Sequence, residues 1–192
     1  STNNVNGYRL QIPETILGDR SGGDTDRTGK SFTISAWVKM DRFMNSGSNN
    51  KGNVIMGHGA QAHTNYNGSL ILATTETGTL KIISGASNTV TSTLNTAVAL
   101  NEWTYLTLVY DNSNVDVCVY KDGVLVTTKN NTKQLELFGD DPCIFFLGGF
   151  GFSGLCDEFQ FFNKALTAQE VAQAYENPQN LSSLTVWYDF NE

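Results

Sequence analysis

Residues 147–178 constrain the fold more than any other part of the 192-residue chain, because they join a glycine-rich turn, an alternating segment and a helix signal. From Gly154 onward, side chains alternate with the period of two that is typical of a β-strand. This period predicts two faces: Leu155, Asp157, Phe159 and Phe161 on one, and Cys156, Glu158, Gln160 and Phe162 on the other. The neighbours Asp157 and Glu158 are therefore expected to point away from each other.

A short helix is expected directly after this strand. Thr167 and Glu170 have the spacing of a capping box, and Leu166 and Val171 have the spacing of a hydrophobic staple. Pro178 cannot extend the helix and disfavours the helical conformation in the residue before it, so the helix should end there after about two to three turns.

Strand signals recur along the chain between clusters of Gly, Asn, Asp and Ser, which favours an antiparallel arrangement over βαβ units. The clearest turn is Asp122-Gly123, whose residue types suit a two-residue hairpin. The candidate strands are residues 8–12, 32–40, 53–57, 69–74, 79–84, 90–94, 103–110, 115–120, 124–129, 144–148, 155–162 and 184–190. Together they predict an all-β fold, a two-sheet antiparallel β-sandwich with one short helix near the C-terminal side.

Several segments resemble the bacterial laminin-G-like domains of the concanavalin A-like lectin/glucanase superfamily. They follow one another in order over nearly the whole chain: residues 32–39 (FTISAWVK), 102–111 (EWTYLTLVYD), 120–126 (YKDGVLV), 154–159 (GLCDEF) and 162–171 (FNKALTAQEV). The resemblance implies a jelly-roll sandwich. It leaves the ligand open, because this fold carries lectins, enzymes and adhesion modules alike.

One domain spanning residues 1–192 is expected, closed by the strand at 184–190 beside the N-terminal strand. With 40% hydrophobic and 16% charged residues the chain can form a packed core. No apolar run approaches the about 18 residues of a membrane span, so no membrane insertion is expected. The chain starts without a signal segment, and the resemblance implies a secreted or cell-surface protein that is a monomer or part of a larger multidomain chain.

The net charge of −7 argues against nucleic acid as a partner, because phosphate binding needs clustered Lys and Arg. An acidic surface also suits a neutral ligand such as a glycan. The three cysteines, Cys118, Cys143 and Cys156, permit at most one disulfide, and free packed thiols are favoured over it.

No catalytic constellation is recognised. Glucanases of the superfamily carry an E-x-D-x-E pattern that is absent here, and Asp157 and Glu158 are expected on opposite faces. His58 and His63 have no nucleophile motif beside them, and their spacing favours loop residues that face solvent or a sugar over metal ligands. The chain is therefore predicted not to be an enzyme.

A structural Ca²⁺ ion is the one cofactor that the pattern suggests. Asp19 and Asp24 lie in a glycine-rich loop with several oxygen donors, and Asp157 lies in a part of the resemblance that could contribute a ligand. The alternative is a solvated polar loop in which Asp157 accepts backbone hydrogen bonds.

Ligand contact is expected from loops that mix aromatic and polar side chains, since lectins pair an aromatic platform with groups that reach sugar hydroxyls. The candidate ligand-binding residues are His63, Asn65, Tyr66, Phe150, Phe152 and Arg42. Phe150 and Phe152 have an alternative role in sealing the end of the sandwich. Trp37, Trp103 and Trp187 occur in strand patterns and are expected to pack in the core.

The sequence thus predicts a non-catalytic carbohydrate-binding or adhesion module of an exported bacterial surface protein, with a glycan as partner. The alternatives are a spacer or protein-interaction domain without a sugar ligand, and a divergent glycoside hydrolase.

Overall fold

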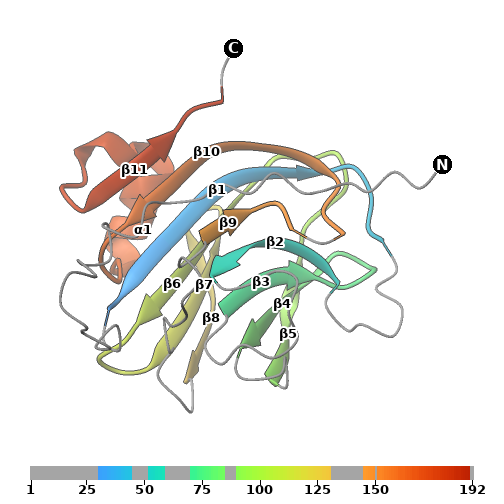
Figure 1. Cartoon of the computed structure of the whole chain (residues 1–192), viewed down its shortest axis with the longest axis horizontal. Helices are drawn as coiled ribbons and strands as arrows, with labels where there is room; N and C mark the ends of the chain where they lie inside the picture. The colour runs from blue at the N-terminus through green and yellow to red at the C-terminus, as the bar shows by residue number, and fades with distance from the viewer. Residues whose placement is uncertain are drawn as a thin grey trace, which may run out of the picture.

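The computed structural model describes residues 30–44, 52–58, 70–84, 90–130, 145–149 and 151–190. These residues form two antiparallel sheets and one short α-helix, α1, which lies on the side of one sheet (Figure 1). The predicted all-β sandwich is confirmed. The expected strand at residues 8–12 lies outside the described residues.

The first sheet has six strands in the spatial order β11 (Leu184–Tyr188), β10 (Gly154–Phe162), β1 (Phe32–Met40), β6 (Thr104–Asp111), β7 (Asp116–Lys121) and β8 (Val124–Asn130). The second has five in the order β5 (Val90–Ala97), β4 (Thr79–Ser84), β3 (Leu70–Thr74), β2 (Asn53–His58) and β9 (Phe145–Leu147). The late strand β11 pairs with β10 in the first sheet.

The core lies between the two sheets, because alternate residues of both contribute to a single apolar cluster. In β1 the even-numbered residues from Phe32 to Met40 belong to this cluster. Phe145 of β9 bridges the sheets, with ring centroids 5.0 Å from Phe32 and 4.7 Å from Phe161. The odd-numbered residues of β1 consequently form the outer face of the six-stranded sheet.

His58 corrects one sequence-based expectation. It was predicted to be a loop residue facing solvent or a sugar, but it is buried, with its ring centroid 4.9 Å from that of Phe145. The reason is that β2 extends one residue further than expected, and the period of two turns His58 inward like Met56.

Helix α1 (Ala168–Glu176) packs on the outer face of the six-stranded sheet. Its buried residues Val171 and Ala174 join an apolar cluster with Val109 of β6, Tyr120 of β7 and Phe162 of β10. The predicted capping box is confirmed, since Thr167 and Glu170 bond to each other's backbone. A 3-10 helix (Pro178–Asn180) follows and leads to β11.

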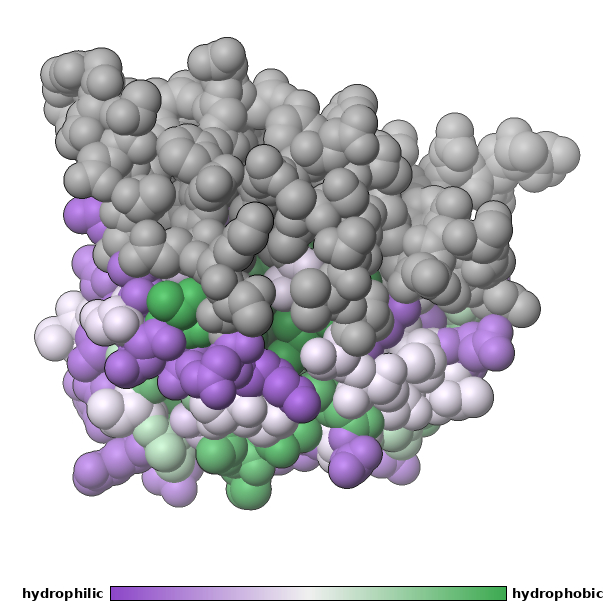
Figure 2. Space-filling model, turned by 90° about the horizontal axis from the view of Figure 1, so that it is seen from below, coloured by the Kyte–Doolittle hydropathy of each residue, from purple (hydrophilic) through white to green (hydrophobic). Residues whose placement is uncertain are grey.

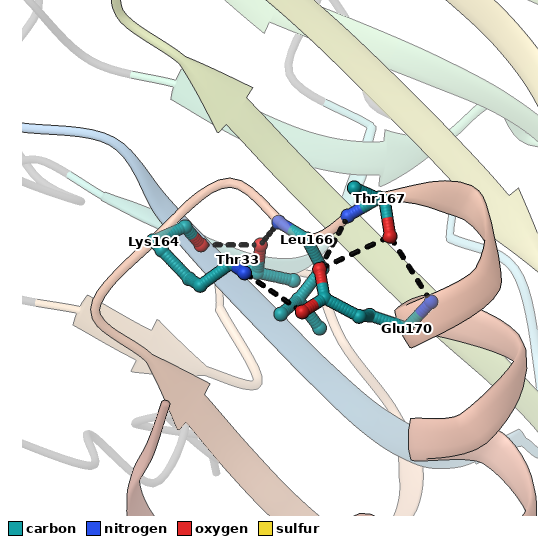
Figure 3. A network of polar contacts seen from close by, with 5 residues as sticks. All are labelled: Thr33, Lys164, Leu166, Thr167 and Glu170. Carbon is teal, nitrogen blue, oxygen red and sulfur yellow. Dashed lines mark hydrogen bonds and ion pairs between the residues drawn. The ribbon is translucent and has the colours of Figure 1, made fainter. Parts of the chain in front are cut away.

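A hydrogen-bond network fixes the start of α1 to the start of β1 (Figure 3). The Thr33 hydroxyl donates to the carbonyl of Lys164 at 2.9 Å and accepts from the Leu166 amide at 3.0 Å. The Glu170 carboxylate accepts from the Lys164 ammonium at 2.7 Å and from the Thr167 amide at 3.0 Å. Every polar group drawn in this network has a partner.

A β-bulge in β10 overturns the predicted alternation. Gln160 lies opposite Ser35 and Asp157 opposite Trp37, so Glu158 and Phe159 together face the single residue Ala36. Glu158 has a positive φ of 47°. As a result Cys156, Phe159 and Phe161 pack against the core, whereas Asp157 and Gln160 lie on the outer face.

The hairpin prediction is confirmed, because Asp122 and Gly123 have φ values of 51° and 77° and join β7 to β8. Cys118 and Cys156 are free thiols, and Cys143 lies outside the described residues. Among the described helices none has the length and apolarity needed to cross a bilayer. In the surface seen in Figure 2, the part formed by described residues shows hydrophobic areas set between hydrophilic ones.

Candidate functional site

Two of the six predicted ligand-binding residues lie at one end of the sandwich, where β1 ends and the β9–β10 connection begins. The Asp41 amide donates to the carbonyl of Ser153 at 3.0 Å, which places the segment after β1 against this connection. Arg42 is exposed there, and Phe152 is half-buried. The structure thus brings Arg42 and Phe152 to a common rim, which we call the loop end.

Phe152 combines both roles that its sequence context suggested. Its side chain packs against the core cluster, and part of it remains accessible. Its amide donates to the carbonyl of Gly149 at 3.0 Å, and Gly149 in turn donates to Val54 at 2.8 Å. These bonds hold the connection to β2, so the accessible part of Phe152 is presented from a fixed backbone.

Asn53 is a structural residue of the loop end that the sequence analysis did not identify. Its buried side chain accepts from the Met44 amide at 2.7 Å and donates to the Thr74 hydroxyl at 3.1 Å. It also donates to the carbonyl of Thr75 at 3.2 Å. A side-chain amide that bridges three segments was not recognisable from sequence, because it depends on β2 and β3 being neighbours.

The remaining predicted ligand-binding residues, His63, Asn65, Tyr66 and Phe150, lie outside the described residues. The same holds for Asp19 and Asp24, the predicted calcium ligands of the N-terminal region. These assignments stay predictions.

Asp157, the third predicted calcium ligand, lies at the bulge of β10. Its Oδ1 atom accepts from the Glu158 amide at 2.7 Å and from the Phe190 amide at 3.3 Å. Within the described ranges, no three His, Cys, Asp or Glu side chains are grouped to hold a metal ion. Asp157 therefore has a structural role, because it joins the bulge of β10 to the segment that follows β11.

A second surface, which the sequence analysis missed, lies where α1 ends on the outer face of the six-stranded sheet. Trp37, Tyr105 and Tyr175 form an aromatic triad, with ring centroids 5.4 to 5.6 Å apart. Tyr105 is buried beneath the other two and donates from its hydroxyl to Gln160 at 2.7 Å. Tyr175 is 37% exposed and Trp37 is half-buried.

The tryptophans accordingly differ from the prediction that all three pack in the core. Trp37 and Trp187 lie on the outer face of the sheet, where their partners in the register are Tyr105 and Gln160. Trp103, one residue before β6, is 44% exposed. The strand pattern alone did not distinguish the two faces, because both faces of this sheet are covered in part by aromatic residues.

Negative charge accumulates beside the triad. Burial raises the pKa of Glu158, and the charges of Asp157 and Asp189 raise it further. Burial also raises the pKa of Tyr105, with a smaller contribution from the charge of Glu158. The negative charges of Asp157 and Asp189 thus act on Glu158 at the bulge.

The fold is a two-sheet antiparallel β-sandwich, and comparison with known proteins shows the family to which it belongs. The profile of the concanavalin A-like lectin/glucanases superfamily, laminin-G type, matches residues 20–172. The chain belongs to this family.

Solved structures share the fold at low sequence identity. Domain 4 of the extracellular GH43 arabinanase of Geobacillus stearothermophilus, solved with arabinotriose, superposes with a TM-score of 0.60 at 22% identity, covering 87% of this chain and 71% of that one. The CBM40 of the Ruminococcus gnavus IT-sialidase, bound to α2,3-sialyllactose, gives 0.59 at 14%, covering 88% and 96%. A heptameric pentraxin of Limulus polyphemus gives 0.56 at 13%, covering 91% and 78%. No sequence match to a curated protein accompanies these likenesses.

Proposed function

We propose that this chain is a non-catalytic carbohydrate-binding module of an exported bacterial protein, with its glycan site at the loop end. The observation that carries the proposal is the rim on which exposed Arg42 and partly accessible Phe152 are held together by the Asp41–Ser153 hydrogen bond. An aromatic ring beside a polar side chain on a fixed backbone is the combination that sugar recognition needs.

The proposal extends to His63, Asn65, Tyr66 and Phe150, whose residue types suit the same site. Tyr66 would stack on the apolar face of a pyranose, while Asn65 and His63 would exchange hydrogen bonds with its hydroxyls. Similarity of the sandwich to sugar-bound modules supports this function, because two of the related structures were solved with saccharides.

A binding role is preferred to hydrolysis because of how the carboxylates at the bulge are used. A glycosidase needs one carboxyl group free to donate a proton and a second on the other side of the scissile bond. Asp157 instead accepts two backbone amide hydrogen bonds through one oxygen.

A bound Ca²⁺ ion remains part of the proposal, with Asp157, Asp19 and Asp24 as ligands. A melting experiment on the intact chain tests it, since an ion that binds only the folded state raises the melting temperature. We expect 2 mM CaCl₂, about 100-fold above a dissociation constant of about 20 μM, to raise it by several degrees relative to EDTA. Identical melting curves would remove the calcium site.

Binding is tested by a glycan array followed by isothermal titration with the best saccharide. We expect Tyr66→Ala and Arg42→Ala each to weaken binding at least about five-fold, corresponding to about 1 kcal/mol. Glu76→Gln, which changes a carboxylate in the exposed β3–β4 turn, is the control and should bind normally. Silence of the wild type towards every glycan would favour a spacer or protein-interaction domain.

The enzymatic alternative has a separate readout. Polysaccharide digestion followed by reducing-end analysis should give no product with the wild type. Turnover that disappears in Glu158→Gln would replace the binding module by a divergent hydrolase.

A further inference from the structure

The surface at the end of α1 has features that the proposed loop-end site does not use. It consists of Trp37 and Tyr175, with Asp157 and Glu158 beside them, and we call it the helix-side surface. Asp157 lies directly opposite Trp37 in the register of β1 and β10. Trp37 is five residues from Arg42 along the chain, so the two surfaces are separated by roughly 15 Å of extended strand.

The carboxylates of this surface lack a compensating charge. In the part of the chain that the structure describes, neither Asp157 nor Glu158 forms an ion pair; the pair recorded there is Lys164–Glu170. Lys39 lies on the same face, one position further along β1, opposite Leu155 rather than Asp157. The surface therefore carries partly desolvated negative charge in a chain whose net charge is already −7.

Buried polar atoms next to the surface provide an independent observation. Trp187, Gln160, Ser35 and Thr107 are successive neighbours across four strands on the outer face. Trp187 Nε1 is buried without a hydrogen-bond partner among the described residues, whereas the Ser35 and Thr107 hydroxyls hydrogen-bond with the Tyr105 hydroxyl. Ser35 and Thr107 are fully buried, and both hydroxyls lie near the Tyr105 hydroxyl beneath the exposed rings.

Such unpaired groups are rare inside proteins, because each costs free energy unless water or a ligand supplies a partner. The Trp187 indole N–H is one such group, and the other polar side chains of the row are buried on the outer face of the sheet next to the aromatic triad.

The chemistry of the surface selects the ligand. Tyrosine and tryptophan faces accept either the apolar face of a sugar ring or a cation. Uncompensated carboxylates form their strongest hydrogen bonds with a positively charged donor, and they disfavour an anionic sugar. A sugar ring that carries an ammonium group can bind the aromatic faces and the carboxylates at the same time.

We propose that the helix-side surface is a second sugar-binding site, selective for an amino sugar with a free ammonium group, such as the glucosamine units of a deacetylated glycan. The ring lies against Tyr175 and Trp37. The ammonium group binds between Glu158 and Asp157. This site goes beyond the proposed glycan site at the loop end and does not depend on it, but it takes Asp157 in place of the proposed calcium ion.

The test is titration of the intact 192-residue chain with the tetramer of glucosamine and with its fully N-acetylated counterpart, at low and at high salt. We expect the glucosamine tetramer to bind at least ten-fold more tightly than the acetylated one, with a difference that shrinks at high salt. Glu158→Gln, which keeps the shape of the side chain, should lower the affinity about ten-fold. Tyr175→Ala changes an exposed ring and should lower it about five-fold.

The controls distinguish binding at this site from a general effect of charge and from binding at the loop end. Glu76→Gln removes the same charge from the other sheet and should leave glucosamine binding unchanged, as should Arg42→Ala. Loss of neutral-glycan binding in Arg42→Ala with intact glucosamine binding would show two separate sites. If the proposed glycan site at the loop end does not exist, neutral glycans will not bind while the glucosamine tetramer still binds.

Three results would overturn the proposal: no binding of the glucosamine tetramer, equal affinity for the two tetramers, or affinity unaffected by both Glu158→Gln and Tyr175→Ala.

Discussion

The two ends of α1 use glutamate in opposite ways. At the N-terminal end, Glu170 accepts from Lys164 and from Thr167, and these bonds lower its pKa. At the C-terminal end, Glu158 meets burial and two further carboxylates, which raise its pKa. One glutamate is stabilised in its charged form, and the other is destabilised in it.

This difference distinguishes structural polar groups from groups available to a ligand. Around Thr33 and Glu170 every polar atom drawn in Figure 3 has a partner, so the network positions α1 on the sheet. Next to Gln160, the hydrogen-bond partner of Tyr105, the indole N–H of Trp187 is buried without a partner among the described residues. The first end of the helix should therefore matter most for folding, and the second for binding.

The largest effect is expected from Thr33→Val at the satisfied end. Valine keeps the shape but leaves the Leu166 amide and the Lys164 carbonyl without their partner. We expect the free energy of unfolding, measured by urea denaturation, to fall by about 2–3 kcal/mol. Thr33→Ser keeps the hydroxyl and should cost at most about 1 kcal/mol, from the lost methyl group. Equal losses in the two variants would contradict the role given to the hydrogen bonds.

A smaller loss is expected from Thr167→Ala, which removes the N-cap of α1. The Glu170 amide loses its side-chain acceptor, and the cost should be about 1 kcal/mol in the same denaturation experiment. Thr167→Ser retains the oxygen and should remain close to the wild type. A serine variant as unstable as the alanine variant would argue against capping as the cause.

Local signals in the sequence were sufficient for this end of the helix. Thr167, Glu170, Leu166 and Val171 are close in the chain, so spacing alone predicted the cap, the staple and the start of α1. The Asp122-Gly123 hairpin was predictable for the same reason, because the two residues themselves adopt the required positive φ.

The helix-side surface could not be predicted, because it depends on a bulge. Glu158 has no sequence signature for a positive φ, and strict alternation placed Asp157 on the same face as the core residue Phe159. One additional residue exchanges the faces of everything that follows in the strand. Tyr175 reaches Trp37 only because α1 packs on the outer face of the six-stranded sheet, which no spacing reveals.

Arg42 and Phe152 at the loop end were predictable only in part. Their residue types suggested ligand contact, but their proximity follows from the hydrogen bond between Asp41 and Ser153, residues far apart in sequence. The sequence indicated the chemistry of Arg42 and Phe152, but it did not indicate the geometry of the rim.

Stability measurements at different pH values distinguish the two glutamates. Because the pKa of Glu170 is lowered in the folded chain, its contribution to stability is present above its ordinary pKa of 4.5 and is lost as pH falls through the folded value. Glu170→Gln should therefore lower stability by about 0.5 kcal/mol at pH 7. The difference from the wild type should vanish near pH 3. A loss that is equally large in acid would mean that the charge is unimportant.

The smallest effect, with the opposite sign, is expected at Glu158. Its folded pKa is raised, so the stability linked to its protonation is fully present below the ordinary value of 4.5 and is lost as pH rises through the folded pKa. Glu158→Gln removes the repulsion from Asp157 and Asp189, and should stabilise the chain at pH 7 by about 0.3 kcal/mol, or about 1 °C in a thermal melt. The gain should disappear on acidification, as the wild-type carboxyl becomes neutral. A variant that is less stable than the wild type at pH 7 would show that Glu158 is held by a favourable contact, and would remove the argument that this carboxylate is available to a cationic ligand.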